Sequence, residues 1–159
     1  MRVLGIDPGL RIAGYGCIDY KHSNSNPLVV EAGAITLDTK QTISFRLAQL
    51  YHDIQEIIVE LKPDLLAVET VFTHKQQVAT ATILGHARGV ILLAGVNASL
   101  PLSEITPAEI KKSVSGNGRA TKSQIQQAVK NTLQLKTIPE PPDVADALAI
   151  AITAAHRNV

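Results

Sequence analysis

The first sixteen residues constrain the fold more than any other stretch of this 159-residue chain. The apolar run Arg2–Ile6 has the length of a strand and ends in Asp7-Pro8-Gly9, which is a turn signal. A second apolar run, Ile12–Ile18, follows at once, so we expect the two strands to pair as a hairpin with Asp7 at the tip of a central strand. The glycines expected to leave the backbone beside this carboxylate open to close approach are Gly9, Gly14 and Gly16.

Length and composition indicate one soluble domain. A chain of this size can bury a proper core, and we expect residues 1–159 to form a single domain. The single cysteine, Cys17, excludes an internal disulfide and a cysteine-based zinc site, and it suits a reducing cytoplasm. The N-terminus lacks the pattern of a signal peptide, and the longest apolar run, near Val90–Val96, is too short to span a bilayer. We therefore expect a cytoplasmic protein with no membrane partner.

A second carboxylate is expected beside Asp7. The run Leu28–Thr36 predicts a third strand, and apolar residues at helical spacing from Ile43 to Leu61 predict an amphipathic helix. Leu65–Val68 then has the length and composition of a buried strand. A strand that follows a crossover helix lies parallel to its neighbour, and parallel neighbours end at the same edge of a sheet. This places Glu69, directly after that strand, beside Asp7.

A long apolar helix is expected over residues 76–98. Gly85 and Gly89 lie four residues apart on one helical face, where they allow another backbone to come close. Because this helix is apolar nearly all round, it needs more than one burial partner. It is either a central core helix or a helix that packs on both the sheet and a second subunit, and the second interpretation is slightly favoured.

Basic residues gather in the middle of the chain. Residues 71–130 hold seven basic and two acidic side chains, a net charge of +5, while the remainder carries −4. Within this region a glycine-hinged loop with basic residues on both sides, Lys111–Lys122, joins two predicted helices and could follow a phosphate backbone. The alternatives are a plain helix connection and a solvated basic face. The pattern favours a polyanion-binding surface beside a separate acidic site.

Two further acids begin the last helix. Asp143 and Asp146 are three residues apart, so both project from one face of its first turn. Each acid has a structural alternative, such as a turn, an exposed strand end or a helix cap. Taken together with Asp7 and Glu69, however, they form a group with no nearby Lys or Arg to neutralise it. Such a group repels strongly without cations, and oxygen ligands select Mg²⁺ or Mn²⁺. A pair of these ions about 3.5–4 Å apart would support in-line attack of water on a phosphodiester.

Four segments of the chain, in order, resemble the RuvC family of Holliday-junction resolvases. They are Gly5-Ile6-Asp7-Pro8-Gly9 with Gly14-Tyr15-Gly16, Ala67-Val68-Glu69-Thr70-Val71-Phe72, Gly85-His86-Ala87-Arg88-Gly89-Val90, and Asp143-Val144-Ala145-Asp146-Ala147-Leu148-Ala149-Ile150-Ala151. Each segment alone is a weak signal, but the ordered set spans nearly the whole chain and is highly specific.

The resemblance implies an α/β, ribonuclease H-like fold, with a mixed five-stranded sheet flanked by helices. It implies a homodimeric, magnesium-dependent endonuclease that nicks four-way DNA junctions symmetrically and leaves 5′-phosphate and 3′-hydroxyl ends. The two expected ions are Mg²⁺, for which Mn²⁺ can substitute, and the expected partners include the branch-migration proteins RuvA and RuvB. The implied metal ligands and catalytic acids are Asp7, Glu69, Asp143 and Asp146. The expected DNA-binding residues are Phe72, Lys75, Lys111, Lys112, Arg119 and Lys122, and the expected dimer residues are Gly85, Arg88 and Gly89.

Three other functions remain open at this point. An Asp-x-Gly turn between glycine-rich strands also resembles the phosphate loop of actin-like ATPases, but those need a second domain that 159 residues cannot supply. A non-catalytic junction-binding protein would gain nothing from four clustered negative charges. A ribonuclease H-like nuclease for RNA–DNA hybrids would use the same chemistry on another substrate.

Overall fold

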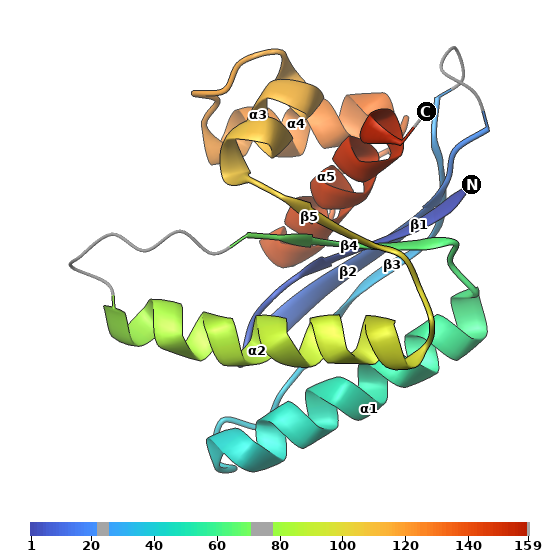
Figure 1. Cartoon of the computed structure of the whole chain (residues 1–159). Helices are drawn as coiled ribbons and strands as arrows, with labels where there is room; N and C mark the ends of the chain where they lie inside the picture. Colours follow the sequence, from blue (N-terminus) through green and yellow to red (C-terminus); the bar gives the residue numbers. More distant parts are fainter. Residues whose placement is uncertain (22–25, 71–77, 159) are drawn as a thin grey trace.

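A computed structural model describes residues 1–21, 26–70 and 78–158 of the chain (Figure 1). The strands of this part are β1 (Arg2–Asp7), β2 (Ile12–Asp19), β3 (Leu28–Thr36), β4 (Leu65–Glu69) and β5 (Leu102–Ile105). Its helices are α1 (Ile43–Leu61), α2 (Val78–Asn97), α3 (Pro107–Ser115), α4 (Lys122–Thr132) and α5 (Pro142–Arg157). The predicted strands and helices are therefore confirmed, with shifts of a few residues at their ends. The expected loop Lys111–Lys122 is shorter than predicted, because α3 continues to Ser115 and α4 begins at Lys122.

The five strands form one mixed sheet in the order β3-β2-β1-β4-β5. β1 is antiparallel to β2 and parallel to β4, as the sequence predicts. The parallel register pairs Ile6 with Val68, so the next residue, Asp7, lies beside Glu69 at the same edge of the sheet. On the other side, the antiparallel register pairs Asp7 with Gly14. The sheet thus brings two acids together from positions 62 residues apart.

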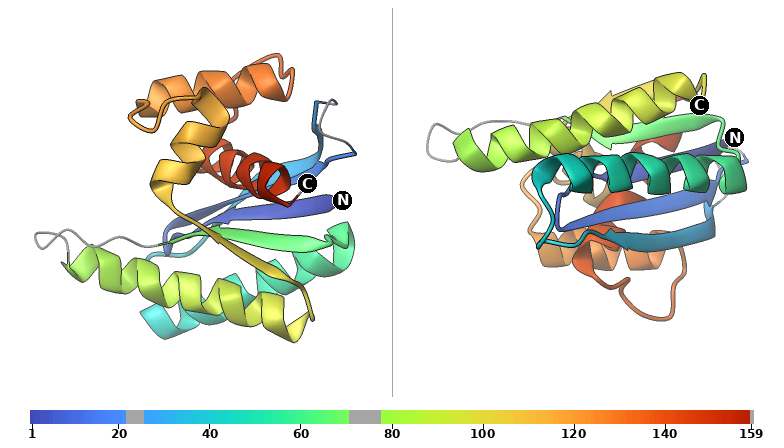
Figure 2. Two further views of the ribbon diagram at one scale, coloured as in Figure 1. Left: turned by 45° about the horizontal axis from the view of Figure 1, so that its top comes forward. Right: turned by 90° about the horizontal axis from the view of Figure 1, so that it is seen from below.

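Helices cover both faces of the sheet (Figures 1 and 2). α1 and α2 pack side by side on one face, and α5 crosses the other face, with α3 and α4 on its outer side. Because side chains alternate along a strand, Leu4 and Ile6 point into the core under α1 and α2, whereas Val3 joins the core under α5. By the same alternation, Asp7 faces the side of α5.

Glycines let α5 lie directly on β1 and β2. A Cβ atom at Gly14 would stand 2.0 Å from the carbonyl oxygen of Asp143, and one at Gly5 would stand 2.3 Å from that of Ala147. The predicted close approach at Gly14 and Gly16 is therefore made by the protein's own helix, whereas at Gly9 it is made by the backbone of Ile12. Without a side chain between them, the sheet and the first turn of α5 come into backbone contact. Asp143 therefore lies against Gly14, the residue of β2 that pairs with Asp7.

Helix α2 is longer than the apolar run that the sequence pattern indicated. Its 20 residues are long and apolar enough to cross a bilayer by length and composition alone, whereas the sequence pattern suggested only a short run near Val90–Val96. This criterion is weak, because core helices of soluble proteins also meet it. Only 22% of the 18-residue apolar window is buried within the chain, and exposed side chains on this helix include Leu93 and Val96. α2 therefore has an apolar outer face that the described part of the chain leaves uncovered.

We expect Gly14→Ala to destabilise the fold by about 1–3 kcal/mol, because the added methyl group would force α5 away from β2. Urea unfolding measures this change. The matched control is Gly118→Ala, where the nearest atom to the new Cβ is 3.9 Å away. Equal free energies of unfolding for the two variants would contradict the direct contact between α5 and the strand.

Candidate active site

Three elements bring the four predicted acids to one edge of the sheet. Asp7 is the last residue of β1, and Glu69 is the last residue of β4. α5 begins at Pro142, whose ring is suited to the first helical position, so Asp143 lies in the first turn and Asp146 follows about one turn later. Pro141 is the N-cap of this helix, which leaves the Asp143 carboxylate free of a capping role.

The electrostatics of Asp7 demonstrate that the acids form one group. Burial, together with the charges of Asp146, Glu69 and Asp143, raises the pKa of Asp7 to about 8. Burial also raises the pKa of Glu69, and the charge of Asp146 adds to this effect. The charges of the other three acids act on Asp7, so the strand tips and the start of α5 lie close together in this structure. Because ionisation of these carboxylates is so unfavourable, a positive charge between them would stabilise the group.

A lysine supplies part of that charge, contrary to the expectation that no basic residue is near. The Lys122 Nζ atom lies 2.8 Å from Asp146 Oδ2, and this hydrogen bond raises the pKa of the lysine. The charge of Lys122 also opposes the rise in the pKa of Asp7 and of Glu69, and Lys111 acts similarly on Glu69. The sequence did not predict this pair, because Lys122 and Asp146 lie far apart in the chain and come together only through the packing of α4 on α5.

Two helix starts place these lysines. Thr106 caps α3 and Thr121 caps α4, each in a reciprocal capping box with the residue three positions on. Lys122 is therefore the first residue of α4. A cavity of about 290 Å³ opens between these helices and the acids, and its lining consists of Glu69, Pro107, Ile110, Lys111, Lys122, Ile125, Asp146 and Ala149. Two of the acids, Glu69 and Asp146, thus share one recess with Lys111 and Lys122.

The remaining predicted residues fall into three groups. Lys112 is exposed in the last turn of α3, and Arg119 is exposed on the loop between α3 and α4; both lie outside the lining of that cavity. Gly85 and Gly89 lie on the exposed side of α2, where an added Cβ would meet nothing within 4 Å. Phe72 and Lys75 lie outside the described residues.

The third predicted dimer residue, Arg88, is directed into its own chain. Its Nε atom donates a hydrogen bond of 3.1 Å to the carbonyl oxygen of Glu69, and its guanidinium pairs with the Glu104 carboxylate. Sequence reasoning missed this contact, because a helical arginine carries no signal of the backbone atom that it reaches.

The donor set fits a divalent cation. The four predicted ligands are all carboxylates, with no sulfur or imidazole among them. Hard cations such as Mg²⁺ or Mn²⁺ prefer such oxygen ligands. The raised pKa of Asp7 shows that the group is electrostatically unfavourable even with the positive charge of Lys122 beside it. Asp7, Glu69, Asp143 and Asp146 are therefore suited to hold metal ions.

Comparison with known proteins identifies the family. The family model described as "Crossover junction endodeoxyribonuclease RuvC" matches residues 3–154. A protein of that name from Caldanaerobacter subterraneus is 46% identical over 158 residues, which cover 99% of this chain and 94% of the relative. One from Alkaliphilus oremlandii is 47% identical, with the same coverage. The chain belongs to the RuvC family.

A solved RuvC structure matches the whole architecture. Thermus thermophilus RuvC in complex with a Holliday junction substrate superposes with a TM-score of 0.91 and 30% sequence identity, and the match covers 99% of this chain and 94% of that one. The ribonuclease H-like fold implied by the sequence resemblance is thereby confirmed.

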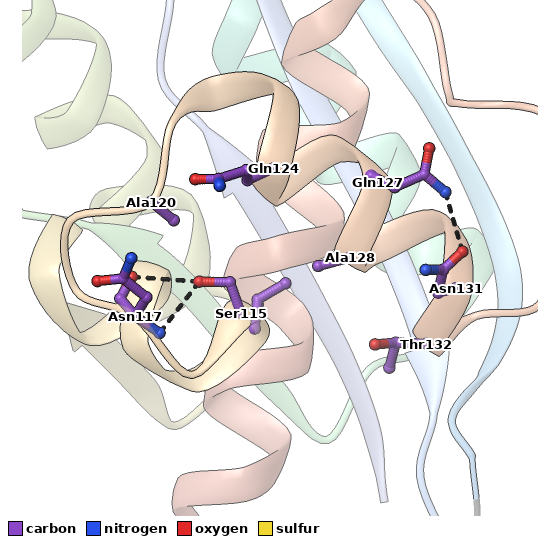
Figure 3. A pocket seen from close by; sticks show the side chains of 9 residues that line it. Ser115, Asn117, Ala120, Gln124, Gln127, Ala128, Asn131 and Thr132 are labelled. Carbon is purple, nitrogen blue, oxygen red and sulfur yellow. Dashed lines mark hydrogen bonds between the residues drawn. The ribbon is translucent and has the colours of Figure 1, made fainter.

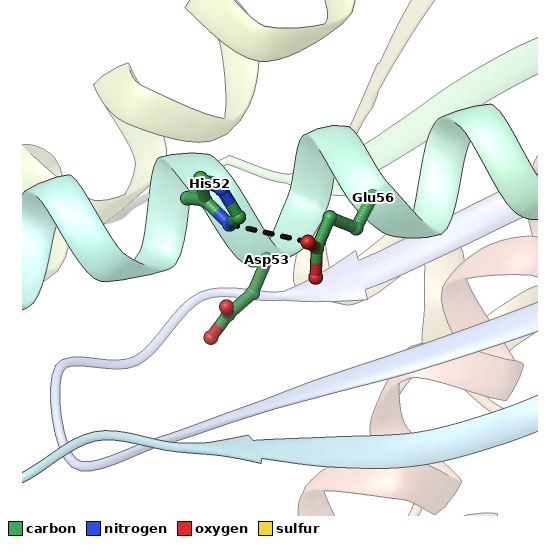
Figure 4. A group of neighbouring side chains, drawn as sticks. All are labelled: His52, Asp53 and Glu56. Carbon is green, nitrogen blue, oxygen red and sulfur yellow. Dashed lines mark ion pairs between the residues drawn. The ribbon is translucent and has the colours of Figure 1, made fainter.

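Other polar features of this RuvC-family chain lie apart from the four acids. On α1, which covers the opposite face of the sheet from α5, ligand atoms of His52, Asp53 and Glu56 lie within 4.8 Å of one another (Figure 4). They could hold a metal ion, but His52 and Glu56 are exposed neighbours on one helical face, 3.6 Å apart, and such groups are common without an ion.

A larger cavity, about 590 Å³, lies between α3 and α4 (Figure 3). Its lining carries amides and hydroxyls, which partly bond to one another, as Gln127 does to Asn131 at 2.9 Å. Its lining contains none of the four acids, so the size of a cavity alone does not identify the candidate active site.

We expect Asp7→Asn to stabilise the metal-free protein increasingly as pH rises from about 4 to about 8. In this range the unfolded chain has lost the Asp7 proton while the folded chain keeps it, so the wild-type fold loses stability as pH rises. The gain should reach the order of a few kcal/mol at the upper end.

Thermal unfolding in chelator at about pH 5 and about pH 8 measures the difference. The matched control is Glu60→Gln, which removes an exposed carboxylate on α1 and is measured at the same two pH values. A constant difference between Asp7→Asn and wild type across the range would contradict the burial of Asp7 among the other acids.

Proposed function

We propose that this chain is a Holliday-junction resolvase, a structure-selective endonuclease that cuts four-way DNA junctions by paired symmetric nicks in recombination and repair. The observation that carries the proposal is the group of four carboxylates at the joint edge of β1, β4 and α5, in a chain that matches the RuvC family from residue 3 to 154. The similarity to a RuvC that was solved with a Holliday junction supports the substrate.

The four acids would bind two Mg²⁺ ions, for which Mn²⁺ can substitute. Bound divalent ions activate water and stabilise the leaving oxygen of a phosphodiester, giving 5′-phosphate and 3′-hydroxyl ends. The protein's own part is to hold Asp7, Glu69, Asp143 and Asp146 in one place against their repulsion, which the close contact of α5 with the strands achieves. Lys122 pairs with Asp146, and with a cation bound to Asp146 this lysine would be suited to contact a DNA phosphate instead.

The basic side of the site would hold the DNA backbone. Lys111 and Lys122 stand in the recess beside Glu69 and Asp146. Lys112, on the last turn of α3, and Arg119, on the loop that follows, would extend this positive surface. Phe72 and Lys75, which follow β4 in the sequence, are proposed to contact the junction as well, Phe72 by stacking on a base. They lie outside the described residues, so Phe72 rests on the sequence resemblance and Lys75 on its place among the basic residues in the middle of the chain.

The outer face of α2 is the proposed homodimer contact. It exposes apolar side chains together with Gly85 and Gly89, which permit close approach of a second backbone. A dimer would place two active sites on one symmetric junction, as paired nicks require. We further propose that residues 1–159 act as a single cytoplasmic domain with RuvA and RuvB as partners.

Cleavage of a synthetic four-way junction tests the function. We expect magnesium-dependent paired nicks in the junction, with a linear duplex and an RNA–DNA hybrid left intact. Asp7→Asn should abolish cleavage but retain or improve junction binding, because it removes a metal ligand and a charge that repels DNA. The change in cleavage should be at least about a hundredfold.

Each rival function predicts a different result. Tight junction binding without nicks by the wild type would indicate a non-catalytic binding protein, and cutting of the hybrid would indicate another substrate. Loss of both binding and cleavage in Asp7→Asn would contradict the separation of the acidic site from the basic surface.

The dimer proposal is tested by Gly89→Leu. The bulky side chain should separate the two backbones and weaken dimerisation at least about tenfold, as measured by sedimentation equilibrium. Because an added Cβ at position 89 has no neighbour within 4 Å among the described residues, the monomer should remain folded. An intact dimer would show that this face is not the contact.

A further inference from the structure

Arg88 contacts the backbone of Glu69, a predicted metal ligand, from the face of the sheet that α2 covers. The arginine projects inward from α2, with its side chain 20% exposed, and its Nε atom donates to the carbonyl oxygen of Glu69 at 3.1 Å. Its guanidinium also pairs with the Glu104 carboxylate of β5. The Glu69 side chain faces α5, since Val68 next to it points into the core under α1 and α2. Arg88 therefore reaches Glu69 without contacting its carboxylate.

The peptide bond that follows Glu69 is held at both of its polar atoms. The Thr70 N–H donates to the carbonyl oxygen of Ile105 at 2.8 Å, and the Glu69 carbonyl of the same peptide unit accepts from Arg88. In a trans peptide these two atoms point in opposite directions. One bond alone would leave this peptide unit free to tilt, whereas the two together fix its plane at the end of β4.

We propose that Arg88 is a positioning residue, which fixes the main chain of Glu69 so that its carboxylate stays directed at Asp7 and Asp146. The carboxylates repel one another, as the raised pKa values of Asp7 and Glu69 show, so a terminal strand residue would turn its side chain away unless its backbone were held. Glu104 keeps the guanidinium in place through their ion pair. This inference rests on the proposed function, because it assigns Glu69 the role of a metal ligand.

The positioning role and the predicted dimer role of Arg88 have different consequences. Gly85 and Gly89 lie on the open side of α2, whereas the Arg88 guanidinium contacts β4 and β5. A positioning residue changes metal binding and leaves the dimer intact. A dimer residue changes association and leaves metal binding to each protomer unchanged.

The experiment compares Arg88→Gln and Arg88→Lys with Arg157→Gln. Lysine at position 88 keeps a charge opposite Glu104 but loses the Nε donor. Arg157 is the matched control, because its Nη1 atom donates a bond of the same kind, 3.0 Å, to the carbonyl of Glu104. Mn²⁺ binding to the DNA-free protein is measured by titration calorimetry, with sedimentation for the dimer and junction binding in chelator.

We expect both Arg88 variants to bind Mn²⁺ about tenfold more weakly than wild type, with the dimer and junction binding unchanged. Cleavage by these variants should need correspondingly more Mg²⁺ and approach the wild-type rate at saturation. Arg157→Gln should bind Mn²⁺ as the wild type does.

Unchanged Mn²⁺ affinity in folded Arg88 variants would overturn the proposal, and a lost dimer with normal affinity would assign Arg88 to the interface. If Arg88→Gln does not fold, Arg88→Lys decides by the same criterion. Failure of the wild type to cut junctions, with Mn²⁺ affinity still reduced in the variants, would refute the proposed function and leave the positioning role standing.

Discussion

The contact of α5 with the glycine-bearing strands β1 and β2 determines where the chemistry can occur. A helix normally stands about 10 Å from a sheet because side chains separate them. At Gly5 and Gly14 there is no side chain, and the carbonyls of Ala147 and Asp143 come against the strands. The first turn of α5 therefore lies at the tip of β1 instead of above it. Asp143 and Asp146 meet Asp7 as a consequence of backbone packing, before any metal is considered.

The site that results is held together against its own electrostatics. Burial and three neighbouring carboxylates make ionisation of Asp7 unfavourable, and Lys122 offsets only part of this repulsion. The fold tolerates the arrangement because the strands and α5 belong to an extensive apolar core, to which Val3, Leu148 and Ile152 contribute. Hydrophobic packing thus stabilises a geometry that charge alone would separate, a common relation between cores and functional sites.

Much of this arrangement was predictable from the sequence, because local patterns carry it. The turn after Ile6, the helical spacing from Ile43 to Leu61 and the parallel crossover to Leu65 fix which strand ends share an edge. The pair Asp143 and Asp146 follows from helical geometry. For these residues, sequence position nearly determines spatial position, and the ordered resemblance to the RuvC family adds the chemistry.

Contacts between side chains of distant elements could not be predicted in this way. Lys122 reaches Asp146 because α4 packs on α5, and Arg88 reaches the Glu69 carbonyl because α2 crosses under β4. Neither contact has a local pattern, since a charged residue on a helix looks the same whether it faces solvent or a buried acceptor. The glycines illustrate the same limit: the sequence indicated close approach but not that α5 itself occupies the space.

Because α2 is one continuous helix, an insertion or deletion within it is more restricted than a substitution. Each residue advances an α-helix by about 100°, so one residue inserted between Arg88 and the buried Ile91 would turn the guanidinium away from β4. Substitutions on the outer face leave that angle unchanged. Length changes within α2 should therefore be much rarer among functional homologues than substitutions, and a homologue with such a change would need a different donor for the carbonyl at the end of β4.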